Sequence, residues 1–98
     1  MIKVTLTPNA LKDLTKLDKP ISKKASTALT KLQTNPKAGH TLEGSLKNTR
    51  ALEFTVVGTA YRIAYIFRED KNRCVVFAIG SHENFYQLAA RRHKTLKE

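Results

Sequence analysis

The sequence lacks the features that stabilise small secreted, membrane-spanning and zinc-binding proteins. Its single cysteine, Cys74, cannot form an internal disulfide, and no second cysteine or cluster of histidines completes a zinc site. The longest uninterrupted apolar run covers residues 74–79, whereas a bilayer span needs about 20 residues. No basic segment followed by an apolar one opens the chain as a signal peptide would. We therefore expect a cytoplasmic protein that inserts into no membrane and has a hydrophobic core containing Cys74.

Glycine and proline are scarce as well, with 4 and 3 residues among 98. This composition excludes a fibrous or disordered chain, and the length suits a single domain over residues 1–98. The glycines do not fall in the spacing of a P-loop or a dinucleotide-binding fingerprint. The histidines, His40, His82 and His93, lie far apart and lack the spacing of a metal site. We expect neither a metal nor a nucleotide cofactor.

Acidic residues are few compared with basic ones. Eighteen Lys and Arg against 8 Asp and Glu give a net charge of +10. The excess is largest over residues 1–40, which hold eight lysines and two aspartates. Such a charge favours a polyanionic partner, but it fits DNA-binding modules, ribosomal proteins and nucleases equally. The activity has to be inferred from particular residues.

Residue patterns in the first part of the chain predict a strand and two helices. Apolar and polar residues alternate over residues 2–7, as in a half-buried strand. Thr7-Pro8 then has the residue types of a helix start, and apolar side chains recur on one face of a helix over 8–17. Asp18 suits the cap of a second helix, which Asn35-Pro36 ends.

The second part of the chain predicts a long loop, three strands and a closing helix. Residues 36–50 show no sustained period, and a loop of that length is often functional. Strands are expected over 51–57, 60–68 and 73–79, and the last of them is apolar on both faces, as an interior strand should be. An amphipathic helix with a basic end follows from Phe85. The order β-α-α-β-β-β-α predicts an α+β fold with a four-stranded, mainly antiparallel sheet.

The turn between the two middle strands sets a predicted register. Gly58-Thr59 suits a two-residue type II′ turn, which pairs Val57 with Ala60. Tyr61 and Tyr65 then lie on the core face. The opposite face carries Glu53 and Arg62 together, with Glu53 across from Ala64 and Thr55 across from Arg62. A carboxylate and a guanidinium are therefore expected on one exposed surface.

Four residues suit cleavage of a phosphodiester without a metal. Such a site needs a fixed cation for the charge that develops on phosphorus, a base for the nucleophile and an acid for the leaving oxygen. Arg62 is the candidate cation, and His82 suits proton transfer near neutral pH. Glu53 and Tyr86 are further candidates for proton transfer. RNA supplies its own nucleophile, the 2′-hydroxyl.

Three segments resemble the RelE/ParE superfamily of bacterial type II toxins: Leu42 to Lys47 (LEGSLK), Tyr61 to Tyr65 (YRIAY) and Val75 to Arg92 (VVFAIGSHENFYQLAARR). The resemblance covers nearly the whole chain. For the RelE branch it implies a small antiparallel sheet with helices on one side, whose other face binds mRNA in the ribosomal A site. It also implies cleavage by 2′-hydroxyl attack, which leaves a 2′,3′-cyclic phosphate and a 5′-hydroxyl.

The resemblance also assigns roles by position. Arg62 would stabilise the transition-state phosphate, Tyr86 would abstract a proton or stack on a base, and His82 would transfer a proton. Two lysines prominent in some RelE members align with Glu53 and Thr55, so this chain departs from that pattern; other members use a glutamate as base. Backbone contacts to RNA are expected from four basic residues: Lys47, Arg50, Arg91 and Arg92.

The function implied is a ribosome-dependent mRNA endonuclease toxin whose partners are a cognate antitoxin, the ribosome and mRNA. One alternative is a ParE-like inhibitor of DNA gyrase, which acts by binding without hydrolysis. Another is a basic RNA-binding module without toxicity. Each site residue also has a structural interpretation: Arg62 and Glu53 as an ordinary cross-strand pair, His82 as a loop or capping residue, Tyr86 as a packed aromatic. The basic residues could equally be solvated surface.

Overall fold

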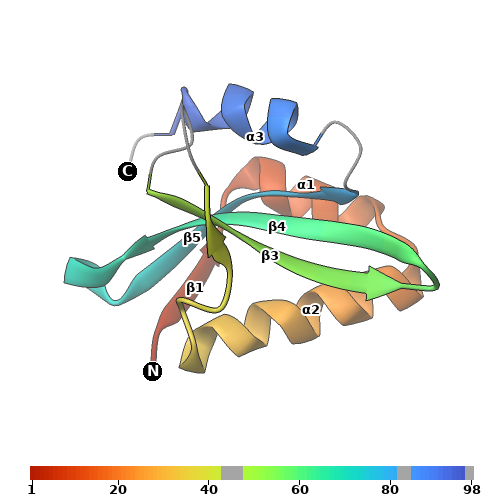
Figure 1. The fold of residues 1–98 in the computed structure, drawn as a ribbon, viewed down its shortest axis with the longest axis horizontal. Helices are drawn as coiled ribbons and strands as arrows, with labels where there is room; N and C mark the ends of the chain where they lie inside the picture. The colour runs from red at the N-terminus through yellow and green to blue at the C-terminus, as the bar shows by residue number, and fades with distance from the viewer. Residues whose placement is uncertain (43–47, 82–84, 97–98) are drawn as a thin grey trace.

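In the part of the chain that the structure describes, the elements form one mixed sheet flanked by three α-helices (Figure 1). A computed structural model describes residues 1–42, 48–81 and 85–96. In these ranges the elements are β1 (Lys3–Leu6), α1 (Pro8–Lys16), α2 (Lys19–Thr34), β2 (His40–Thr41), β3 (Thr49–Val56), β4 (Thr59–Arg68), the short 3-10 helix η2 (Glu69–Lys71), β5 (Arg73–Ser81) and α3 (Phe85–His93). The α+β class is confirmed.

The sheet has the strand order β1-β5-β4-β3-β2, and only β1 runs parallel to its neighbour, β5. The predicted count of four strands is wrong by one within the described residues. The additional strand, β2, is only two residues long and pairs with Arg50 and Ala51 of β3. So short a strand has no period of its own, so residues 36–50 gave only the signal of a loop. The strand predicted to be interior, β5, does lie between β1 and β4.

Both N-terminal helices begin where their sequences predict. The Ala10 backbone N–H donates to Thr7 Oγ1 at 3.2 Å, so Thr7 caps α1, and Pro8 occupies the first turn. Asp18 precedes α2 in extended conformation, although its side chain makes no capping hydrogen bond. The helix ends at Thr34, just before Asn35 and Pro36.

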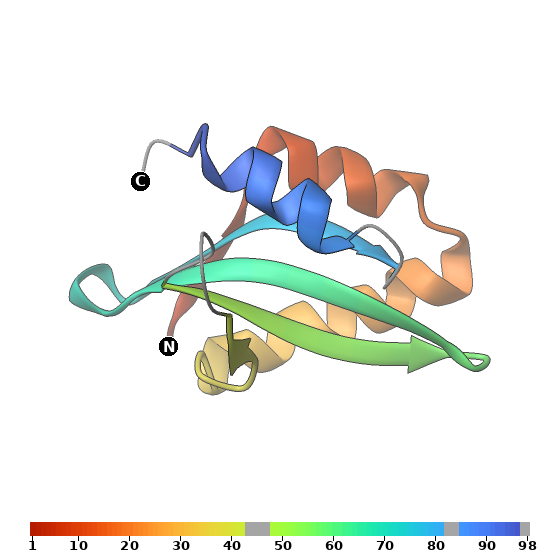
Figure 2. The same ribbon diagram turned by 45° about the horizontal axis from the view of Figure 1, so that its top comes forward.

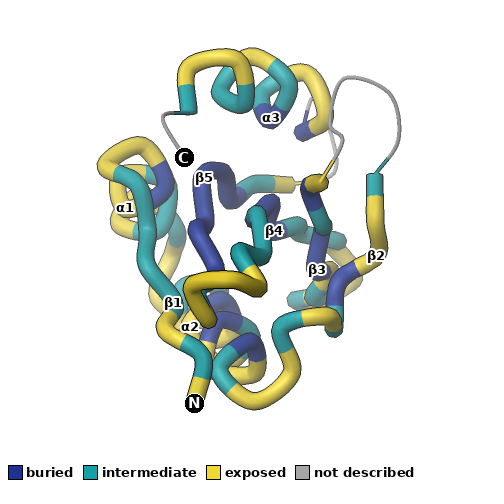
Figure 3. Tube along the Cα trace, turned by 90° about the vertical axis from the view of Figure 1, so that its left-hand side faces the viewer, coloured by how far each residue is buried: buried dark blue, intermediate teal, exposed yellow. Residues whose placement is uncertain are grey.

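The sheet is covered on both faces. Figure 3 shows α2 and α3 on opposite sides of the strands, and Figure 2 shows α3 lying over β4 and β5. The core on the α2 side includes Leu32, Ile63 and Val76, whereas a smaller cluster of Ala64, Phe77, Ala78, Phe85 and Ala89 lies beneath α3. The expectation of helices on one side only is therefore wrong. Amphipathic periodicity identifies a helix but not the sheet face that it covers.

The register of the β3–β4 hairpin differs from the predicted one by two residues. Val56 pairs with Thr59, so the turn is Val57-Gly58, with φ of 47° and 79°. Positive φ at both turn residues is the pattern of a type I′ turn, for which Asn-Gly is the usual signal. An exposed valine gives no such signal, so the sequence favours a turn at Gly58-Thr59. A shift of two leaves every side chain on its predicted face, because strand side chains alternate with a period of two.

Tyr65 anchors the segment before β2 to the sheet. Its hydroxyl donates to the Pro36 carbonyl oxygen at 2.7 Å and accepts from the Gly39 N–H at 3.0 Å. A Cβ at Gly39 would stand 2.8 Å from the Ala51 backbone, so this close approach requires glycine. Burial raises the pKa of the Tyr65 phenol. The predicted core role of Tyr65 is confirmed, while Tyr61 is half-buried and stacks on Phe54.

Candidate active site

Arg62 and Glu53 form an ion pair on the sheet face that carries α3. The observed register pairs Glu53 of β3 directly with Arg62 of β4. Arg62 Nε and one of its terminal nitrogens, Nη2, both donate to Glu53 Oε2, at 3.0 and 2.7 Å. On the other side of β4, Arg62 pairs with Gly80 of β5, which has no side chain to crowd the guanidinium.

Tyr86 completes the cluster from the first turn of α3. Its hydroxyl accepts a hydrogen bond from Arg62 Nη1 at 2.8 Å, and the guanidinium carbon lies 5.3 Å from the centre of its ring. The neighbouring Phe85, the first residue of α3, is buried in the cluster between this helix and the sheet, so the start of α3 is held against the sheet. Tyr86 itself is 39% exposed. The three side chains thus meet at a surface that a ligand can reach.

The side chain of Arg62 is less exposed than the sequence predicts. The side chain of Arg62 is only 15% exposed, against 42% for Glu53, because its guanidinium lies between the carboxylate and the phenol. An arginine fork fits two phosphate oxygens, but here Nε and Nη2 are engaged by Glu53. A phosphate that binds this fork must therefore displace the Glu53 carboxylate.

The remaining predicted site residues do not all join this cluster. His82 and Lys47 lie outside the described residues, so their roles stay predictions. Arg91 is exposed on α3. Arg50 Nη1 donates to the backbone oxygens of Lys37 and Gly39, at 3.3 and 2.7 Å, which gives this residue a contact within the fold.

Arg92 makes an ion pair that sequence reasoning missed. Its guanidinium bonds both carboxylate oxygens of Asp13, which belongs to α1. The two residues are 79 positions apart, and no periodicity or motif links them. Only the folded arrangement of α1 and α3 brings them together.

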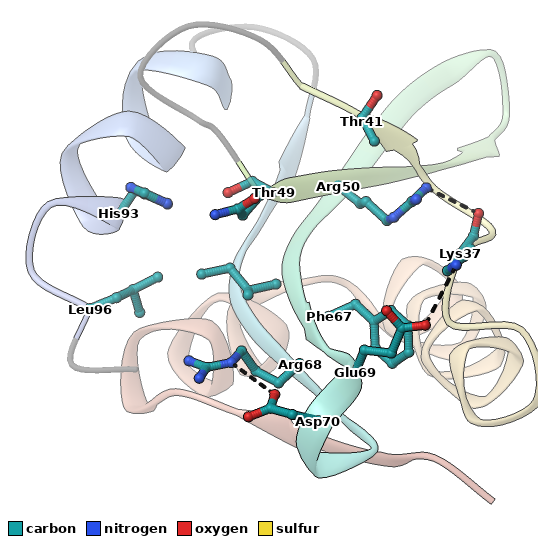
Figure 4. A pocket seen from close by; sticks show the side chains of 12 residues that line it. Lys37, Thr41, Thr49, Arg50, Phe67, Arg68, Glu69, Asp70, His93 and Leu96 are labelled. Carbon is teal, nitrogen blue, oxygen red and sulfur yellow. Dashed lines mark hydrogen bonds and ion pairs between the residues drawn. The ribbon is translucent and has the colours of Figure 1, made fainter.

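A cavity of about 1140 Å³ lies apart from the Arg62 cluster. Figure 4 shows it between His93, at the end of α3, with Leu96 beyond the helix, and the strands that carry Thr49 and Arg68. Neither Arg62, Glu53 nor Tyr86 lines it. Its charged side chains are partly paired, with Lys37 3.8 Å from Glu69 and Arg68 3.7 Å from Asp70. The cavity and the Arg62 cluster are therefore separate features of the described residues.

Within residues 1–42, 48–81 and 85–96, no three His, Cys, Asp or Glu side chains are grouped so that they could hold a metal ion. No helix in the same ranges combines the length and the apolar character of a membrane span. Cys74 is buried in β5, and burial raises the pKa of its thiol to about 11. A protonated, enclosed thiol is a poor nucleophile, so it contributes no reactive group to the site.

Comparison with known proteins gives a family and a fold. The family described as "ParE-like toxin of type II bacterial toxin-antitoxin system" matches residues 4–89. No curated protein sequence matches the chain. Among solved structures, an Escherichia coli RelE toxin mutant in the free state has a TM-score of 0.76 at 20% identity, and the match covers 93% of this chain and 96% of that one.

Two toxin–antitoxin complexes also share the fold. The intact RelBE complex of Escherichia coli matches with a TM-score of 0.71 at 21% identity, over 85% of this chain and 99% of that one. A RelBE complex of Mycobacterium tuberculosis matches with a TM-score of 0.70 at 24% identity, over 83% and 98% of the two chains. At these identities the structures establish the RelE-like fold alone.

Proposed function

Because the chain belongs to the ParE-like toxin family of type II bacterial toxin–antitoxin systems, we propose that it is a toxin that cleaves mRNA on the ribosome without a metal. The observation that carries the proposal is the cluster of Arg62, Glu53 and Tyr86. It combines a permanent cation with two groups able to exchange a proton, on an accessible face of the sheet. A protein that acts by binding alone has no need of this combination.

In the proposed reaction Arg62 binds the scissile phosphate and displaces the Glu53 carboxylate from its fork. The 2′-hydroxyl of the preceding ribose attacks phosphorus as a base removes its proton. The bond from phosphorus to the 5′-oxygen breaks, and an acid protonates that oxygen. The products are a 2′,3′-cyclic phosphate and a 5′-hydroxyl. Arg62 stabilises the charge on the phosphoryl oxygens throughout.

Two residues compete for the role of base. Glu53 loses its guanidinium partner when phosphate binds, which leaves its carboxylate oxygen Oε2 open to accept the proton of the 2′-hydroxyl. Tyr86 keeps its hydroxyl beside Arg62, within reach of a phosphate bound there. His82, predicted from the sequence, is the proposed acid because its unperturbed pKa lies near neutrality. The Glu53 carboxylate is the base that we favour.

We also propose that a cognate antitoxin binds and restrains the protein. The structurally similar RelE chains of two organisms were solved with an antitoxin. The net charge of +10 favours an acidic partner and accelerates association with one. Expression of the chain alone should then arrest growth, and coexpression with the antitoxin should restore it.

A second candidate function is inhibition of DNA gyrase by binding, which the ParE-like description of the family favours. One pair of assays separates the two. In a reconstituted translation reaction, primer extension should detect cuts within the translated mRNA, and the same mRNA without ribosomes should stay intact. Intact mRNA under translation, together with loss of gyrase supercoiling activity, would instead support the second candidate.

A further inference from the structure

A charged network connects α1, β5 and α3. It lies along the edge of β5 that faces β1, whereas the Arg62 cluster lies on the β4 side of this strand. Asp13 Oδ2 accepts from Arg92 Nη1 at 2.5 Å, and Asp13 Oδ1 accepts from Arg92 Nη2 at 3.1 Å. The Ile79 N–H also donates to Asp13 Oδ2 at 3.0 Å, and Arg92 Nη1 donates to the Phe77 carbonyl oxygen at 3.1 Å. The side chains of Asp13 and Arg92 are only 15% and 18% exposed.

This network replaces a missing stretch of sheet. The pairing of β1 with β5 ends at Leu6 and Val76, whereas β5 continues to Ser81. Beyond that point β5 still pairs with β4, but on its other edge the Ile79 N–H and the Phe77 carbonyl have no β1 residue opposite them. Buried backbone groups need partners. Asp13 and Arg92 supply one each. The position that they secure, Ile79, directly precedes Gly80, the residue paired with Arg62.

The same network fixes the position of α3 along the sheet and its rotation about its own axis, which the apolar contacts of the helix leave free. Phe85 and Ala89 hold the helix against the sheet, but apolar burial is non-directional and permits sliding or rotation. A two-point bond between a guanidinium and a carboxylate has a defined geometry. Arg92 lies six residues after Tyr86, about 9 Å along the helix axis. Fixing Arg92 therefore fixes the position of Tyr86 along β4.

We propose that Asp13 and Arg92 are positioning residues, which hold Tyr86 against Arg62 through α3 and β5. The part of this inference that concerns rate rests on the proposed mRNA cleavage. The part that concerns the geometry of Tyr86 does not. The network also gives Arg92 a role different from the RNA contact predicted for it, since its guanidinium is engaged by Asp13 and by the Phe77 carbonyl.

The test combines two variants with a control. Asp13→Asn keeps the shape of the side chain but removes its charge, and Arg92→Lys keeps the charge but loses the two-point geometry. Asp70→Asn makes the same chemical change in an ion pair, 3.7 Å from Arg68, that does not involve α3. Thermal melting identifies any variant that fails to fold, and the two network variants substitute for each other in that case.

The first readout needs no activity. With ¹³C-labelled tyrosine, the ring signals of Tyr86 should shift in Asp13→Asn and Arg92→Lys, whereas those of Tyr65, buried on the α2 side, should not. The control should leave both sets in place. Unmoved Tyr86 signals in both network variants would overturn the proposal, even if the protein proves to be no nuclease.

The second readout is single-turnover cleavage of ribosome-bound mRNA. With Glu53 as base, the ring of Tyr86 has the other role that the resemblance implies, which is to stack on a base of the RNA. A misplacement of about 1 Å can cost a factor of about 10² in rate, so each network variant, which displaces the whole ring, should lose about 10- to 100-fold in maximal rate. The half-saturating toxin concentration should stay within about twofold. In a Tyr86→Ala background, Asp13→Asn should cost less than about threefold, because the contact it maintains is already lost. An equal loss in both backgrounds would contradict positioning through Tyr86.

Discussion

Replacement of Arg62 by alanine removes the cation of the proposed site, and the structure separates its effect on rate from its effect on folding. The side chain donates to Glu53 through two nitrogens and to Tyr86 through a third. None of these contacts lies in either core cluster, so the substitution opens no cavity there. Arg62→Ala should therefore leave the fold intact.

The expected loss of stability and the expected loss of rate in Arg62→Ala differ enough to be distinguished. A partly exposed ion pair contributes about 0 to 1 kcal/mol to stability. For a domain of this size, 1 kcal/mol lowers Tm by about 4–8 °C. Loss of a donor that stabilises transition-state charge costs a factor of about 10² to 10³ in rate, or about 2.7–4 kcal/mol. The rate loss thus exceeds any loss that partial unfolding at assay temperature would cause.

The assay is single-turnover cleavage of ribosome-bound mRNA at saturating toxin, with a thermal melt of the same sample. Arg62→Lys serves as the matched variant, because it keeps the charge but cannot bond two phosphate oxygens in parallel. We expect a loss of about 10² or more for Arg62→Ala and little recovery for Arg62→Lys. A rate within about threefold of wild type for Arg62→Ala, in folded protein, would refute this role of Arg62.

Three further predictions concern proton transfer and stability. Glu53→Gln and His82→Gln should each slow single-turnover cleavage by about 10² or more. Tyr86→Phe should slow it as much only if the phenol is the base. Normal cleavage by Glu53→Gln together with slow cleavage by Tyr86→Phe would make Tyr86 the base in place of Glu53. Tyr65→Phe leaves the buried Gly39 N–H and the partly buried Pro36 carbonyl without the tyrosine hydroxyl and should cost about 1–3 kcal/mol in urea denaturation. An unchanged midpoint would contradict this. Burial raises the pKa of the Cys74 thiol to about 11, so the folded protein keeps a proton that the unfolded chain loses above about pH 8.5. The unfolding free energy should fall between about pH 8.5 and 11, less so in Cys74→Ala; parallel curves would refute the effect.

Much of the fold follows from local patterns, and the errors arise where a pattern is too short or ambiguous. The starts of α1 and α2 follow from Thr7-Pro8 and Asp18, because capping depends on a few adjacent residues. The two-residue strand β2 has no period to detect. The predicted register of the β3–β4 hairpin differs from the observed one because the turn places Val57 at positive φ, where valine is rare.

The sequence predicts which residues form the candidate site better than it predicts how they contact one another. Alternation along β3 and β4 places Glu53 and Arg62 on one face in either register, and the observed register makes them direct partners. The contact of Tyr86 with Arg62 depends on α3 covering that face, which no sequence period determines. The pair of Asp13 and Arg92 depends on tertiary packing alone.

The measurement that tests the proposed function most directly removes the nucleophile from the substrate. An mRNA is prepared with a single 2′-deoxynucleotide immediately 5′ of the mapped cut, and a second with the substitution several nucleotides upstream. Both are translated with the wild-type protein and analysed by primer extension. Attack by the 2′-hydroxyl predicts loss of the cut in the first mRNA and normal cleavage in the second. Equal cleavage of both would contradict the mechanism proposed for the Arg62 site.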